Sequence, residues 1–110
     1  MTIDKKTFTA LQETAGAEFV VELVGAFFEE APVMLSNLES SLAAGDAEKF
    51  RRTAHSLKSN ANTFGAQALA AIAKDLELSG LDQVRTRPAP LTAVNEEYAR
   101  VAAALKELCA

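Results

Sequence analysis

The stretch from Gly45 to Gly65 reads GDAEKFRRTAHSLKSNANTFG, and it shows most clearly which fold to expect. Between the two glycines, apolar residues recur every three or four positions, which is the period of an amphipathic α-helix. Gly45 is typical of the end of a preceding helix, and Asp46 is a typical N-cap for the next one. We therefore predict a helix from Asp46 or Ala47 to Phe64. Its inward side would consist of Phe50, Ala54, Leu57, Ala61 and Phe64.

The same helical period continues on both sides of this stretch, and no segment is a clear strand candidate. A short helix is predicted over 7–14 and a long one over 17–44, separated by Gly16. Two more helices are predicted over 66–79 and 90–108. Residues 81–90 contain three charged residues and two prolines, so they predict a mobile loop. The chain is therefore expected to be all-α, a single domain over 1–110: an antiparallel up-down-up-down four-helix bundle with a short additional N-terminal helix.

Composition narrows the classes of function. The chain has 110 residues and a net charge of -4, which argues against a nucleic-acid partner. No apolar run approaches the ~18 residues of a membrane span, and Met1 to Lys6 lack a secretory signal, so we expect a cytoplasmic chain with no membrane partner. One histidine and one cysteine make a zinc site improbable, and no metal site is predicted.

The one histidine, His55, lies on the second predicted long helix, on the side opposite Leu57 and Phe64. It is therefore predicted to face solvent. Its neighbours on that side include cations and small polar residues: Arg51, Arg52, Lys58, Ser59 and Asn62. This basic face on an acidic chain is suited to an anion. An imidazole that is largely neutral near pH 7 has a ring-nitrogen lone pair that can attack phosphorus, and Lys58 could offset the charge of the transferred group.

Two other interpretations use the same residues. An ordinary solvated helix face, with Glu48 and Arg52 as an i,i+4 ion pair, needs no function at all. A serine hydrolase is poorly supported, because Ser56 points about 100° away from His55 and no carboxylate completes a triad.

The run from Ala54 to Ser59, AHSLKS, followed by NTFGA over 62–66, resembles the signature of histidine-containing phosphotransfer (HPt) domains. That signature is Ala-His-x-Leu-Lys-Gly/Ser with a glycine ten residues after the histidine. The flanking turn over 44–46 and the helix over 69–77 are similar to the family as well, so the resemblance covers most of the chain.

The resemblance implies a phosphoryl carrier rather than an enzyme. His55 would be the phosphoacceptor, Lys58 the cation near the phosphoryl group, and Ser59 the small residue that gives a partner access. The helical spacing around His55 adds Arg51, Arg52 and Asn62 to the phosphate or partner face. Gln67, two residues after Gly65, is expected to offer a hydrogen bond there. The implied partners are response-regulator receiver domains and a hybrid histidine kinase. The chain would have no cofactor of its own, because the receiver supplies Mg²⁺, and we expect a monomer.

Two alternatives remain open. Thr63 to Gly65 also resembles the phosphoacceptor domain of chemotaxis-type histidine kinases, although Ser59 stands where those domains usually have glycine. The other alternative is a helical adaptor that is not phosphorylated. An adaptor would give no role to an exposed histidine beside Lys58.

Overall fold

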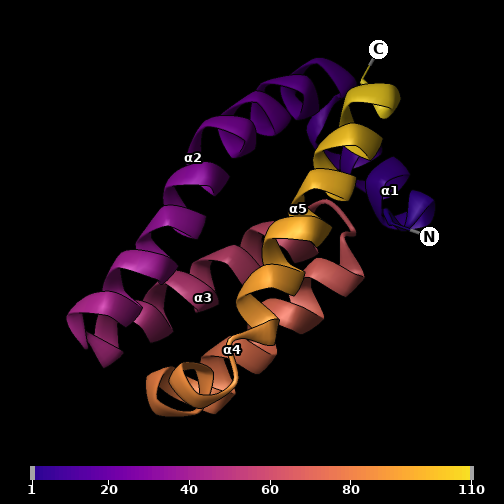
Figure 1. Ribbon diagram of the computed structural model, residues 1–110. Coiled ribbons are helices and arrows are strands. Elements are labelled where there is room, and N and C mark those ends of the chain that lie inside the picture. The colour runs from indigo at the N-terminus through magenta and orange to yellow at the C-terminus, as the bar shows by residue number, and fades with distance from the viewer. Residues whose placement is uncertain (1, 110) are drawn as a thin grey trace.

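A computed structural model describes residues 2–109, which form five helices and no strand (Figure 1). In chain order they are α1 (Lys5–Ala15), α2 (Ala17–Ala44), α3 (Ala47–Thr63), α4 (Gln67–Thr86) and α5 (Ala89–Leu108). Connections of one to three residues join consecutive helices. The all-helical prediction is confirmed for the described residues. No helix among them is long and apolar enough to span a membrane.

The helix α3 lies between two neighbours, because it packs against both α2 and α4. In turn α4 packs against α5, α5 reaches α2, and α1 rests on α2 and α3. Every inward residue predicted for α3 is buried. At the centre, the Phe27 ring lies 5.3 Å from that of Phe64 and 5.7 Å from that of Tyr98, measured between ring centroids. Because α3 is buried against two helices, its remaining outward side is held rigidly at the surface.

The turn between α2 and α3 has the predicted chemistry. Gly45 adopts the left-handed conformation, with φ +75°, and its backbone N–H donates to the Leu42 carbonyl. The Asp46 carboxylate accepts a hydrogen bond of 3.1 Å from the Lys49 backbone N–H. This bond satisfies one of the free N–H groups in the first turn of α3.

The prediction of a mobile loop over 81–90 is wrong. The helix α4 bends at Gly80, where φ is +76° and ψ is 176°, and then continues to Thr86. Leu81 and Val84 are buried, so this last part of α4 belongs to the core. The Arg85 guanidinium also donates a hydrogen bond of 3.0 Å to the Leu42 carbonyl near the end of α2. The two prolines lie at the start of α5, where a proline is compatible with a helix.

The short turn between α3 and α4 holds the N-terminal segment in place. The Asp4 backbone N–H donates a hydrogen bond of 2.8 Å to the Gly65 carbonyl. Gly65 has φ +79°, and a Cβ added there would lie 2.9 Å from the Asp4 carbonyl oxygen. Gly65 is therefore needed both for its backbone conformation and for this close approach.

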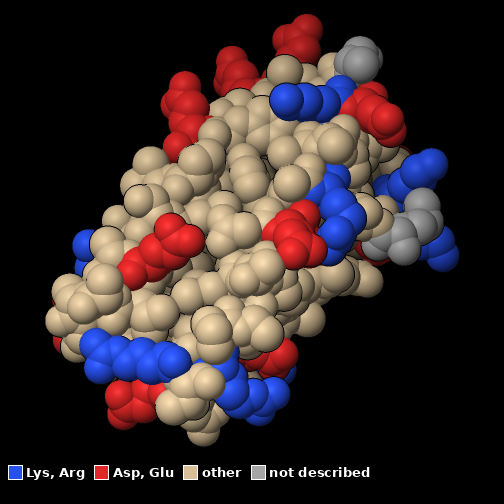
Figure 2. Space-filling view, in the orientation of Figure 1, with Lys and Arg blue, Asp and Glu red and all other residues tan. Residues whose placement is uncertain are grey.

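The molecular surface is mixed in charge. On the face shown in Figure 2, Lys and Arg side chains are interspersed with Asp and Glu side chains around a largely uncharged middle. Acidic side chains follow the upper edge, over the N-terminal half of α2. A local concentration of cations, such as the one predicted on α3, therefore contrasts with an overall negative charge of -4.

Candidate functional site

The outward side of α3 carries the candidate site. The side chain of His55 is 57% exposed, whereas Leu57, two positions later, is fully buried. This confirms the predicted orientation of the helix. Because the backbone of α3 is fixed by its buried residues, the imidazole has a defined position at the surface although most of the ring is open to solvent.

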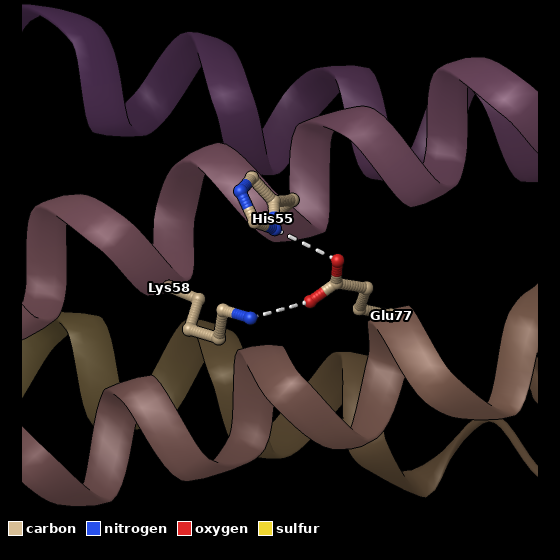
Figure 3. A network of polar contacts seen from close by, with 3 residues as sticks. All are labelled: His55, Lys58 and Glu77. Carbon is tan, nitrogen blue, oxygen red and sulfur yellow. Dashed lines mark hydrogen bonds and ion pairs between the residues drawn. The ribbon is translucent and has the colours of Figure 1, made fainter.

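A carboxylate from the next helix joins His55 to Lys58 (Figure 3). The Nδ1 atom of His55 lies 2.8 Å from Oε2 of Glu77, and Nζ of Lys58 lies 2.9 Å from Oε1 of the same carboxylate. Glu77 belongs to α4, so the network connects α3 and α4. Its side chain is only 15% exposed and that of Lys58 is 25% exposed. Two different helices thus determine the orientation of the imidazole.

The charge of Glu77 decides which ring nitrogen carries hydrogen. The hydrogen bond from Lys58 lowers the pKa of Glu77 below 4.5, the bond to His55 lowers the pKa further, and partial burial opposes both effects. Near neutral pH the carboxylate is ionised and can only accept hydrogen bonds. Nδ1 of His55 must therefore carry a hydrogen. In the neutral imidazole the lone pair is then on Nε2, the nitrogen that Figure 3 shows turned away from Glu77.

The other predicted residues surround this network without joining it. Arg51 and Arg52 are exposed on α3 before His55, and Nε of Arg52 lies 4.0 Å from Oε1 of Glu48. Ser59 and Asn62 are exposed on the same helix after His55. Gln67 is exposed at the start of α4. Of the site residues predicted from sequence, only Lys58 shares a bonded partner with His55 among residues 2–109.

A groove lies between α2 and α3. It is lined by Met34, Asn37, Lys49, Arg52, Thr53 and Ser56. Arg52 lines this groove, whereas Lys58 is directed toward α4, where it contacts Glu77. Arg52 and Lys58 therefore lie toward different neighbouring helices, α2 and α4.

Glu77 is the functional candidate that sequence reasoning missed. It lies 22 positions after His55, on another helix, and helical spacing within α3 gives no information about it. A weak signal existed, because Glu77 directly follows Leu76 and lies four residues after Ala73, both buried. A carboxylate on the border of an apolar stripe needs a partner.

Within residues 2–109, no three side chains of the His, Cys, Asp or Glu types gather closely enough to hold a metal ion.

Comparison with known proteins gives two matches. The profile of the Hpt domain family matches residues 22–110. The crystal structure of histidine-containing phosphotransfer protein B (HptB) from Pseudomonas aeruginosa PAO1 is similar to this chain, with a TM-score of 0.86 and 32% sequence identity. The similarity covers 98% of this chain and 94% of that one. No curated protein sequence matches the chain.

Proposed function

Because this chain belongs to the Hpt domain family, we propose that it is a phosphorelay carrier in which His55 reversibly accepts a phosphoryl group from receiver-domain aspartates. One observation supports this role above the others: His55 is exposed, and a carboxylate on α4 occupies its Nδ1 side. That arrangement leaves Nε2 as the nucleophile and directs it to solvent, where a partner can approach.

The proposed transfer is a displacement at phosphorus. The Nε2 lone pair of His55 forms an N–P bond, the bond from phosphorus to the aspartate oxygen breaks, and its electron pair remains on the aspartate carboxylate. The ring retains its hydrogen at Nδ1 and becomes cationic as the N–P bond forms. Glu77, 2.8 Å from Nδ1, stabilises this cation, so the chain itself needs no general base.

The exposed residues around His55 are proposed to meet the partner. Arg51 and Arg52 would attract the acidic surroundings of a phosphorylated aspartate, because opposite charges steer association. Ser59 is small enough to allow close approach, and Asn62 and Gln67 would offer hydrogen bonds at the edge of the contact. We propose that Mg²⁺ comes with the receiver domain and that this chain supplies no cofactor.

Label transfer tests the proposal. The chain is mixed with several receiver domains carrying labelled phosphoaspartate, and label is expected on it in a form that is labile to acid and stable to alkali, as for phosphohistidine. His55→Gln should abolish labelling. Ser56→Ala is the matched control, because it removes the neighbouring hydroxyl and should leave labelling intact.

Two results would contradict the carrier role. Labelling that persists in His55→Gln would place the phosphoryl group elsewhere. Absence of labelling by every receiver would favour the adaptor, unless a kinase ATP-binding domain labels His55 directly. That last result would support the chemotaxis-type alternative.

A further inference from the structure

Helical geometry decides which side chains of α3 can cover the imidazole of His55. In an α-helix each side chain is directed toward the N-terminus, so a residue covers the surface over the turn that precedes it. Arg51 and Arg52 come before His55 and are therefore directed away from it. The residues of α3 that can cover the histidine are those three and four positions later, Lys58 and Ser59.

Lys58 and Ser59 lie on opposite sides of His55. At about 100° per residue, Lys58 is rotated about 60° to one side of the histidine and Ser59 about 40° to the other. The Lys58 side faces α4, where Nζ lies 2.9 Å from Oε1 of Glu77. Figure 3 shows Nε2 of His55 turned away from both Glu77 and the Lys58 ammonium. A phosphoryl group on Nε2 would therefore project to the side of the helix that carries Ser59.

The hydroxyl of Ser59 is available for a hydrogen bond. Thr53 and Thr63, on the same helix, donate their hydroxyls to carbonyls one turn earlier, over 2.7 and 3.0 Å. Within residues 2–109, the Ser59 hydroxyl makes no such bond to the His55 carbonyl or to another group. Because Ser59 is exposed, its hydroxyl can turn toward a group beside His55 without breaking a bond in the described part of the chain.

From these positions we propose that the Ser59 hydroxyl donates a hydrogen bond to the phosphoryl group on Nε2 of His55. The proposal rests on the proposed function, because it takes His55 as the phosphoacceptor, and it gives Ser59 a role beyond allowing a partner to approach. Hydrogen bonds to charged acceptors are stronger than those between neutral groups. This bond forms only in the phosphorylated chain, so it shifts the equilibrium of transfer toward phosphohistidine.

The first experiment uses a small phosphodonor, phosphoramidate, so that no receiver is needed. Nε2 of His55 forms the new N–P bond, the P–N bond of phosphoramidate breaks, and ammonia leaves with its electron pair. The pH titration of the attached phosphoryl group is then followed by ³¹P NMR, and His55→Gln should give no phosphohistidine signal. Ser59→Ala should raise the pKa of the phosphoryl group by about 0.3–1 unit, because a hydrogen-bond donor favours its more highly charged form.

Two further variants identify the hydroxyl as the cause. Ser59→Gly also lacks the hydroxyl, so it should give the same phosphoryl pKa as Ser59→Ala even though it leaves more room. Ser56→Ala is the matched control, because it removes another exposed hydroxyl of α3 that lies about 100° around the helix from His55. It should titrate as the wild type does. Melting curves show whether each variant is folded.

The second experiment measures the equilibrium between the phosphorylated chain and a phosphorylated receiver domain. Ser59→Ala should lower the ratio of phosphohistidine to phosphoaspartate about two- to tenfold, and Ser56→Ala should leave it unchanged. If Ser59 only gave the partner access, its replacement would change the forward and reverse rates by the same factor and would not change this ratio. The ratio therefore separates a hydrogen bond from an effect of size.

The proposal is overturned if the phosphoryl group of Ser59→Ala titrates as in the wild type, or if the equilibrium ratio is the same in both. Failure of phosphoramidate to label His55 would also contradict it. Failure of every receiver to label the chain would contradict the carrier role instead. In that case the titration of the chemically phosphorylated chain would still decide whether Ser59 contacts the phosphoryl group.

Discussion

At the scale of single residues, Glu77 connects the stability of the fold to its chemistry. The hydrogen bond from Lys58 is the largest cause of its lowered pKa, followed by partial burial, which acts in the opposite direction, and by the bond to His55. A carboxyl whose pKa is lower in the folded state stabilises the fold above its unfolded pKa. That contribution is lost as the pH falls through the folded pKa.

The consequence is a prediction about acid. Glu77→Gln should melt at a lower temperature than the wild type near neutral pH, and the difference should shrink as the pH falls below 4.5, the ordinary value for this group. Thermal melts followed by circular dichroism at a series of pH values measure it. In a Lys58→Met background, Glu77→Gln should cause a melting-temperature difference that depends less on pH. A difference that stays constant or grows in acid would show that Glu77 is not held ionised by its neighbours.

At the scale of elements, the turns position the helices that carry the site. The turn between α3 and α4 is tightly constrained, because Gly65 has φ +79° and a Cβ added there would lie 2.9 Å from both the Asp4 carbonyl oxygen and the Thr7 Cβ. This turn fixes where α4 begins to pack along α3, and therefore where Glu77 lies relative to α3. The bend at Gly80 has a different use, since it redirects the end of α4 so that Leu81 and Val84 remain in the core.

Two glycine substitutions should have opposite effects. Gly65→Ala should reduce the free energy of unfolding by about 2 kcal/mol, since a left-handed alanine is strained and its Cβ meets backbone. Gly25→Ala is the matched comparison, because Gly25 lies inside α2 with open space around an added Cβ. Gly25→Ala should raise the free energy of unfolding by about 0.5–1 kcal/mol. Urea unfolding measures the free energy of unfolding of both variants. A Gly65→Ala variant as stable as the wild type would mean that the N-terminal segment is not packed against this turn.

At the scale of the whole molecule, one core is shared by all five helices, and α3 contributes to it and to the surface at once. Leu57 and His55 are two positions apart on that helix, with opposite exposure. A change on the inner side of α3 therefore affects every helix, whereas a change on its outer side affects the site.

Paired substitutions test this division. Leu57→Asp should unfold or severely loosen the protein, because an unpaired carboxylate in the core costs several kcal/mol, a large fraction of the ~5–15 kcal/mol that stabilises a domain. His55→Gln should leave the melting temperature within a few degrees. Circular dichroism reports both the loss of helix and the melting temperature. Equal losses in the two variants would contradict the placement of His55 at the surface.

Local physics made much of this architecture predictable. The helical period placed Phe50 and Leu57 inside and His55 outside, and glycine with an N-cap aspartate marked the turn after α2, because these features depend on residues within a few positions of each other. The end of α4 differs from the prediction, because the charged residues and prolines of 81–90 indicate a loop whereas the i,i+3 pair of Leu81 and Val84 is buried in the core.

Only the tertiary structure decided what surrounds His55. Glu77 is remote in sequence, and its contact with His55 and Lys58 depends on the register in which α3 packs against α4. The same holds for Gly65, whose need for close approach is set by the Asp4 backbone. Sequence alone determined which residues face solvent and which resemble a phosphotransfer signature. Packing determined which nitrogen of His55 is left free, because that depends on an ion pair between two helices.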